Sequence, residues 1–349
     1  MKKPRCKEAS PIRPFKSIRS RALVTAAVLS LALTACGSGT LSGASNSADA
    51  RTSTSAAETG SLTKVSVGAI PIGDVAPIHV GKAQGFFSDE GIDLVIENTN
   101  GGAVSVPGVV AGSYDFAFGN LVSLMVARDK GLDLRYVANG TSTTGEQGKD
   151  FAAVVVLEDS PIKTAKDLSG KTVTSNNLAN IGDTTIRATV DKEGGVGSEL
   201  TFVEIAFPDA FAALEAKQVD ATLILEPFLT PALEQGGRAV LWPYAGAHEN
   251  LDIGGYFTTG ERIEQDPELV AAFTRAMSKS MEFSQENPEA VRTAIGTYTK
   301  TDPELLKKIT LPSFTPVFSR EAAAELGAAA VRYGTLNKAP DLDLLLPKN

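Results

Sequence analysis

Hydrophobic and polar residues follow two periods along the chain, and these predict an alternation of strands and helices. Lys64 to Ala69 alternates and is rich in Val, which is typical of a strand. A helical spacing of apolar residues follows at 78–85, and the two patterns then repeat. Further strands are predicted at 92–97, 116–118 and 134–138, and further helices at 104–111 and 121–130. Strands that alternate with helices favour an α/β domain around a mostly parallel sheet.

A second series of the same kind begins after the extended apolar run Phe151 to Leu157. Its predicted strands are 171–174, 201–204, 221–225 and 239–242, and its predicted helices are 184–193 and 210–217. From Pro267 onward helices dominate, at 268–286, 288–298, 303–311 and 320–333.

A weak internal similarity connects the two series. Residues 106–118 and 211–223 both run from a helix through a short turn with an aspartate, Asp115 or Asp220, into a strand. Two similar α/β lobes would explain this, but any helix-turn-strand unit has the same pattern. Asn120 and Glu226 follow the two strands, and open α/β sheets bind ligands at the carboxyl ends of strands.

The N-terminal segment has the pattern of a secretory signal. A 14-residue apolar run, Ala22 to Ala35, follows a tail with eight Lys or Arg and one acid. The run is short for a membrane span, which needs about 20 residues. Leu33-Thr34-Ala35-Cys36 resembles the lipobox of bacterial lipoproteins, which implies removal of residues 1–35 and a lipid anchor on Cys36, with the protein on the extracytoplasmic face of the cell membrane. Residues 36–61, rich in Gly, Ser, Ala and Thr, are predicted to be a flexible linker.

Composition makes several classes of function improbable. Without residues 1–35 the chain has a formal charge of −15, whereas nucleic-acid binding requires a basic surface. Cys36 is then the only cysteine, so no disulfide can form, and with two histidines a zinc site of His and Cys cannot be assembled. The sequence has no nucleophile elbow, phosphate loop or dinucleotide fingerprint. We therefore expect a protein that is not an enzyme and needs no cofactor.

An ordered series of motifs resembles one family. It comprises Asp-Val-Ala-Pro-Ile-His from Asp74, Val-Val-Ala-Gly-Ser-Tyr-Asp-Phe-Ala-Phe from Val109 and Glu-Pro-Phe from Glu226, within residues 64–300. These are similar to the substrate-binding proteins of ABC importers for nitrate, taurine, alkanesulfonates and thiamine-precursor pyrimidines. The resemblance implies a two-lobed, type II periplasmic-binding-protein-like α/β fold of mostly parallel sheets flanked by helices, closing over a ligand cleft. Lobe 1 would hold residues 62–152 and 246–349, and lobe 2 residues 153–245.

The candidate ligand contacts lie after predicted strands or at predicted helix starts, where free backbone amides attract anionic oxygens. From this placement and the resemblance we expect contacts from Asp74, Asn100, Gly101, Gly102, Asn120, Leu121, Gly140, Thr141, Asn177, Asn180, Ile181, Gly182 and Glu226. Each of the Asn, Gly and Asp positions could instead only cap a helix or a turn. Glu226 could accept a hydrogen bond from a ligand amino group or form a salt bridge near the hinge.

Aromatic side chains are a further set of candidates. Phe228, Trp242, Tyr244 and Tyr256 could stack on a ligand ring or belong to the core.

The resemblance implies a monomeric binding lipoprotein that delivers a small nutrient to a permease driven by an ATPase. Nitrate, taurine or an alkanesulfonate is the first expectation for the ligand, and an aromatic heterocycle such as an aminopyrimidine thiamine precursor or riboflavin is the alternative. Two other classes of function are a thiamine-pyrimidine synthase-like enzyme, which would call for a motif rich in Cys and His, and a sensory lipoprotein.

Overall fold

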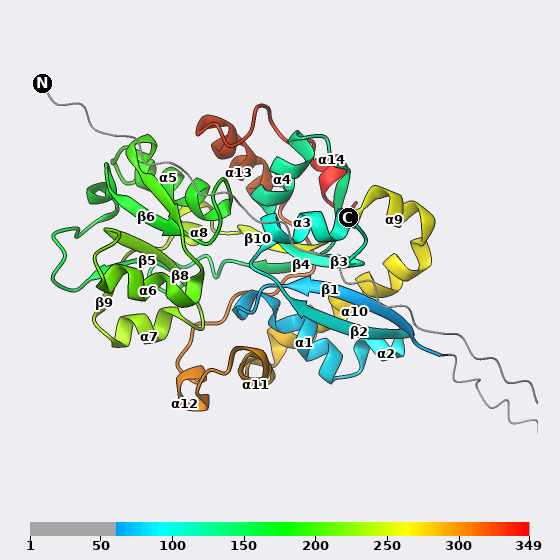
Figure 1. The fold of residues 1–349 in the computed structure, drawn as a ribbon. Coiled ribbons are helices and arrows are strands. Elements are labelled where there is room, and N and C mark those ends of the chain that lie inside the picture. Colours follow the sequence, from blue (N-terminus) through cyan, green and yellow to red (C-terminus); the bar gives the residue numbers. More distant parts are fainter. Residues whose placement is uncertain (1–60, 349) are drawn as a thin grey trace, which may run out of the picture. The chain divides into compact units, whose positions relative to one another are not determined.

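The computed structural model describes residues 61–348, which form two five-stranded sheets flanked by helices (Figure 1). The predicted signal segment, Cys36 and the linker up to residue 60 lie outside the described residues. The first sheet consists of β1 (Thr63–Ala69), β2 (Ile92–Asn98), β3 (Phe116–Asn120), β4 (Leu134–Ser142) and β10 (Asp252–Thr259). The second consists of β5 (Ala152–Leu157), β6 (Thr172–Ser175), β7 (Thr201–Glu204), β8 (Ala221–Leu225) and β9 (Gly237–Leu241). We call the first sheet with its helices lobe 1 and the second lobe 2.

The two sheets have equivalent topologies. Their strand orders are β2-β1-β3-β10-β4 and β7-β6-β8-β5-β9. In each sheet the first three strands are parallel, and the fourth, β10 or β5, runs antiparallel to both of its neighbours. The two-lobed α/β fold predicted from the sequence is confirmed.

Helices cover both faces of the lobe 1 sheet. Figure 1 shows α1, α2 and α10 below the sheet and α3 and α4 above it. The longer helices of this lobe are α1 (Ala76–Ala83), α3 (Gly102–Val110), α4 (Leu121–Asp129), α10 (Pro267–Glu286), α11 (Pro288–Thr299) and α13 (Arg320–Arg332). The short ones are α2 (Phe86–Asp89), α9 (Gly260–Gln265), α12 (Pro303–Leu306) and α14 (Leu342–Leu345).

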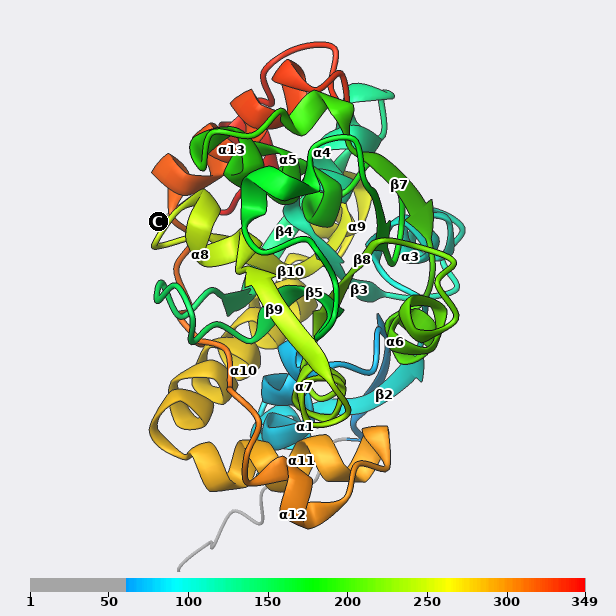
Figure 2. The ribbon, with the colours of Figure 1, turned by 90° about the vertical axis from the view of Figure 1, so that its left-hand side faces the viewer.

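In lobe 2, helix α5 lies on one side of the sheet, and α6 and α7 lie on the other (Figures 1 and 2). The helices are α5 (Ile181–Lys192), α6 (Phe207–Glu215) and α7 (Leu229–Glu234), and α8 (Pro243–Ala247) lies in the segment that returns to lobe 1. The chain passes from lobe 1 to lobe 2 at 143–151 and returns at 242–251. The lobe boundaries expected from the sequence lie after residues 152 and 245. The first is next to the segment 143–151, and the second is within the segment 242–251.

The two segments with similar sequence patterns occupy equivalent places. The Asp115 carboxylate accepts a hydrogen bond from the backbone N–H of Ser66 in β1, and Asp220 accepts one from Thr172 in β6, each at 2.8 Å. In both lobes the aspartate therefore joins the start of the third strand of the sheet to the neighbouring parallel strand.

Two expectations for the elements are wrong. Strand β10 was not predicted, because its central Gly254-Gly255 is unfavourable in strands. These glycines lie so close to the backbones of β3 and β4 that a side chain would clash with them. The helix expected at 303–311 ends at Leu306. Pro312 disfavours helical geometry just before it, and the Thr310 N–H bonds instead to the Glu226 side chain.

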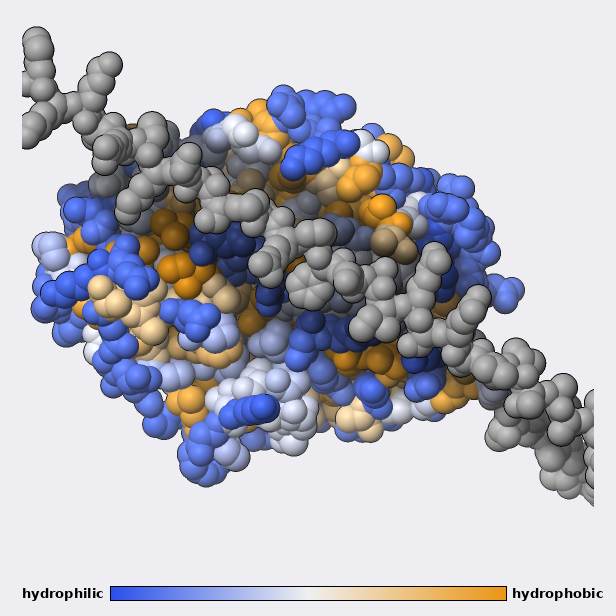
Figure 3. Space-filling model, in the orientation of Figure 1, coloured by the Kyte–Doolittle hydropathy of each residue, from blue (hydrophilic) through white to orange (hydrophobic). Residues whose placement is uncertain are grey.

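The surface mixes polar and apolar groups, and Figure 3 shows hydrophilic residues interspersed with apolar ones on one face. Within 61–348 no helix is long and apolar enough to cross a membrane.

Candidate functional site

A groove between the lobes contains two adjoining cavities. The inner cavity has a volume of about 30 Å³ and the outer one about 230 Å³. Ile70, Ile72, Asn176 and Phe207 line both, so the two form one continuous site.

The inner cavity lies at the carboxyl ends of strands from both sheets. In lobe 1, Asp74 follows β1, Gly101 and Gly102 follow β2, and Asn120 ends β3. In lobe 2, Leu225 ends β8. This is the position at which open α/β sheets bind ligands.

Asp74 is the buried acid of the inner cavity. Its residue is 1% exposed, and its backbone oxygen accepts a hydrogen bond of 2.6 Å from the Thr141 hydroxyl. The carboxylate atom Oδ2 has no hydrogen-bond partner within the described part of the chain. Burial, with a smaller contribution from Asp150, raises the pKa of Asp74 from 3.8 to about 7. Near neutral pH this carboxyl can therefore take up or give up a proton.

No described residue that lines either cavity is Lys, Arg or His. The acids are Asp74 in the inner cavity and Glu204 in the outer one. Tyr244 also lines the inner cavity, and burial raises the pKa of its hydroxyl well above 10. The side chains of the groove thus supply negative charge and apolar surface, but no positive charge.

The lobes meet across the groove at Gly101. Its φ is +116°, and a Cβ atom there would lie 2.7 Å from the Asn177 side-chain oxygen and 3.0 Å from the Asn176 side-chain nitrogen. The inner cavity could hold about two water molecules, since each needs roughly 10–15 Å³. The lobes are therefore in close contact at Gly101, and the inner cavity can admit a larger ligand only if the lobes separate.

Two of the predicted contact residues cap helices. The Asn120 side chain accepts a hydrogen bond from the Ser123 N–H at 2.9 Å and caps α4. Asn180 caps α5 by accepting from the Gly182 N–H at 2.8 Å, and Asp183 completes the capping box. Asn120 lines the inner cavity as well, whereas Asn180 does not.

The other predicted contacts divide into three groups. Gly101, Gly102 and Ile181 line the inner cavity, and Asn100 and Asn177 line the outer cavity. Leu121, Gly140, Thr141 and Gly182 are buried outside the lining of both cavities, and Thr141 bonds to the Asp74 backbone.

Glu226 connects the lobes and lies outside the lining of both cavities. Its side chain accepts hydrogen bonds from the Thr230 hydroxyl at 2.6 Å and from the Thr310 N–H at 3.2 Å. Its backbone oxygen accepts from the Gly73 N–H at 3.1 Å. Burial raises the pKa of the carboxyl. Thr310 and Gly73 belong to lobe 1, so Glu226 holds the end of β8 against that lobe by hydrogen bonds, and it is not among the described ion pairs.

Sequence reasoning missed most of the apolar lining. Ile70, Ile72, Phe118, Phe207 and Ile253 line the inner cavity. In the sequence they have the signal of ordinary core residues.

Of the four candidate aromatic residues, two line the groove. Tyr244 lines the inner cavity and Phe228 the outer one. Tyr256 packs against Phe118 in lobe 1, and Trp242 packs on a small core cluster of lobe 2.

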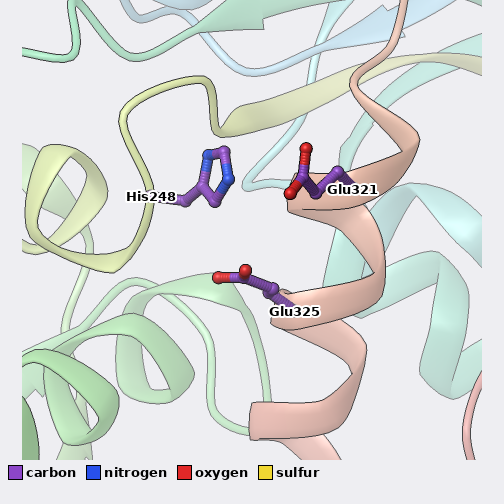
Figure 4. Close-up of side chains that lie close together, drawn as sticks. All are labelled: His248, Glu321 and Glu325. Carbon is purple, nitrogen blue, oxygen red and sulfur yellow. The ribbon is translucent and has the colours of Figure 1, made fainter.

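One group of side chains in the described region could gather around a metal ion. His248 faces Glu321 and Glu325 of α13 (Figure 4), and their donor atoms lie within 4.8 Å of one another. The Asn250 N–H donates a hydrogen bond to His248 Nδ1 at 3.0 Å. In a neutral ring the proton is therefore on Nε2, which a metal would have to displace. None of these three residues lines the groove between the lobes.

Known proteins resemble this chain in sequence and in fold. The riboflavin-binding protein RibY of Chloroflexus aurantiacus is 25% identical over 276 residues, covering 78% of this chain and 76% of that protein. The alkanesulfonate-binding protein SsuA of Xanthomonas axonopodis pv. citri, solved with bound MOPS, has a TM-score of 0.66 at 16% identity, covering 82% of this chain and 98% of SsuA. The nitrate-binding protein NrtA of Synechocystis PCC 6803 has a TM-score of 0.68 at 14% identity, covering 82% and 86%. The two structures show that the fold is that of periplasmic binding proteins. Since the NMT1/THI5 like family model matches residues 73–291, the chain belongs to that family.

Proposed function

We propose that this protein is the substrate-binding component of an ABC importer and captures one small molecule between its lobes. The observation that carries the proposal is a groove in which the lobes meet at Gly101, with one buried carboxylate oxygen of Asp74 that has no partner among the described residues, at the carboxyl ends of strands from both sheets. A ligand that contacts both lobes binds the closed form better than the open form, and this difference shifts the population toward closure. The closed complex is then delivered to a membrane permease and its ATPase.

The proposal includes attachment to the cell membrane. The signal pattern before Cys36 supports export and lipidation at that residue. The protein would then act as a monomer on the extracytoplasmic face. Mass spectrometry of the mature protein should find Cys36 as the acylated N-terminal residue, and an unmodified thiol there would contradict the anchor.

The lining of the groove bears on the choice of ligand. Helices α3, α4 and α5 begin at the groove, and the first backbone amides that the caps leave unpaired favour an anion. A bare nitrate or simple sulfonate would nevertheless meet Asp74 and Glu204 without a cationic side chain in the lining. The flat apolar surfaces of Phe207 and Phe228 support the alternative, an aromatic heterocycle.

Thermal unfolding of a form that begins at Gly37 tests the binding role. The panel is nitrate, taurine, alkanesulfonates, aminopyrimidines, riboflavin and unrelated metabolites. A ligand at 100 times its dissociation constant adds about 2.7 kcal/mol of stability, which raises the midpoint by several degrees. A selective, saturable shift is expected for one chemical class, and product formation from a ligand would instead favour an enzyme. A panel without any saturable shift would contradict the proposal.

A further inference from the structure

We propose that the ligand carries an N–H group, as an ammonium or an amino substituent on a heterocycle, and that Asp74 receives this hydrogen and determines specificity. The inference rests on the proposed binding function and names the chemical class that the groove selects.

The first step is the missing hydrogen-bond partner of Asp74. Asp74 lines the inner cavity, and its Oδ2 atom is buried and accepts no hydrogen bond from any described residue. Buried acceptors are normally paired, because an unpaired one loses water without compensation. An N–H donor on the ligand supplies the missing bond.

The second step is the charge around this carboxyl. The titratable groups that interact with Asp74 are Asp150, Tyr244, Tyr256 and Tyr298. Asp150 already accepts hydrogen bonds from the Thr143 hydroxyl and the Ala245 N–H. None of these groups carries positive charge, so the described part of the chain provides no cation for Asp74, whereas a ligand can.

The third step is the orientation of the ligand. The amino end reaches Asp74 at the inner end of the groove, and the rest of the molecule extends into the larger outer cavity. Pro71, Phe207 and Phe228 give that cavity apolar walls, and the Asn177 side-chain oxygen is a second buried atom without a partner. The ligand therefore presents a donor at its inner end, a flat or aliphatic body and a further polar group toward Asn177.

The affinity for an ammonium ligand should depend on pH. Because the pKa of Asp74 is raised to about 7, the free protein carries a proton on this group in mildly acidic solution. Binding an ammonium ion favours the ionised carboxylate, so this proton goes to the buffer. Affinity should fall as the pH is lowered from 8 to 5.

The experiment compares probes that differ only in an amino group, by calorimetry on the purified protein. Taurine is paired with ethanesulfonate, and 4-aminopyrimidine with pyrimidine. We expect at least one amino probe to bind ten-fold or more tightly than its partner, with loss of this preference in Asp74→Asn. Glu215→Gln in α6 is the control, because it removes the same charge from an exposed position outside the lining of both cavities and should keep the preference.

Two results would overturn the inference, and they are distinguishable. If ethanesulfonate, pyrimidine or nitrate binds saturably and as tightly as the amino probes, Asp74 does not select for N–H and the binding function stands. If neither the four probes nor any other compound of the panel binds, both the inference and the proposed function fail. The paired comparison uses the unaltered protein, so it decides the question even if Asp74→Asn does not fold.

Discussion

At the scale of single residues, the buried carboxyl of Asp74 has two opposite effects. Its burial destabilises the ionised form, and the same charge can be used to recognise a ligand. An ionised carboxylate without a partner is costly in a buried site, and the raised pKa expresses this cost. In the proposed complex, an N–H group of the ligand pairs with the carboxylate and offsets this destabilisation.

The first prediction is that Asp74→Asn stabilises the ligand-free protein at pH 8. The folded state holds a proton on Asp74 between the unfolded pKa of 3.8 and the folded value of about 7. The free energy of unfolding of the unaltered protein therefore falls as the pH rises from about 4 to about 7. Asp74→Asn has no carboxyl at this position, so its stability does not fall for this reason. A shift of this size corresponds to about 4 kcal/mol at most, at 1.36 kcal/mol per pKa unit. Urea unfolding at pH 4 and pH 8 measures it, and a stability difference that does not change with pH would refute the argument.

The second prediction concerns Gly101. A Cβ at this position would meet Asn177 across the groove, so Gly101→Ala should hold the lobes apart and weaken ligand binding at least ten-fold. Gly112→Ala is the matched control, because its φ is +72° but the space around it is open. The control should lose roughly 1–2 kcal/mol of stability for the left-handed backbone and keep its affinity. Equal affinities of the two variants, measured by calorimetry, would show that closure at Gly101 is unimportant.

At the scale of elements, close packing of α1 on α10 depends on Gly81. A side chain at Gly81 would overlap the Ser280 side chain of α10. In contrast, Gly296 in α11 has only the end of the Leu306 side chain nearby.

The third prediction therefore compares two helical glycines. Gly81→Ala should destabilise the protein by roughly 1–3 kcal/mol, the usual cost of overpacking. Gly296→Ala should be close to neutral, because the gain in helix propensity of up to about 1 kcal/mol offsets a small adjustment of Leu306. Thermal or urea unfolding of both variants measures the difference. Equal losses of stability in the two variants would contradict close packing of α1 on α10.

Elements with strong periodicity could be predicted from the sequence, and those shaped by contact with distant backbone could not. The strands at 201–204 and 221–225 have the predicted bounds, because residues that favour strands dominate there: Thr, Phe and Val in the first, and Thr, Leu and Ile in the second. Strand β10 could not be predicted, because Gly254 and Gly255 have no side chains that could form a hydrophobic pattern. For the groove, polar residues after strands such as Asp74 and Asn120 could be selected, whereas Phe207 looked like an ordinary core residue.

At the scale of the whole described region, several contacts join the lobes besides the two chain passages. Glu226 bonds to the Thr310 N–H inside the protein, and Glu234 pairs with Lys308 at 2.6 Å on the surface. The hydroxyl of Tyr333, directly after α13, donates to Asp191 of α5 at 2.6 Å. These contacts differ in burial, which decides how much each contributes.

The fourth prediction uses this difference. Glu226→Ala should lower the free energy of unfolding by about 1–3 kcal/mol, because it leaves partly buried donors of Thr230 and Thr310 without their acceptor. Glu234→Ala removes an exposed ion pair and should change stability by about 0–1 kcal/mol. Urea unfolding of the two variants side by side is the measurement. A larger loss in Glu234→Ala would mean that the surface pair, and not Glu226, holds the lobes.

The position of β10 between β3 and β4 has a consequence for the order of folding. The strands β5 to β9 are contiguous in the chain, so the second sheet has all of its strands once residue 241 has been synthesised. The first sheet begins earlier but lacks its fourth strand until residues 252–259 follow. Chains are made from the N-terminus and their domains tend to fold as units. Lobe 2 can therefore complete its sheet first. The sheet of lobe 1 is completed only when β10, which follows lobe 2 in the chain, inserts between β3 and β4.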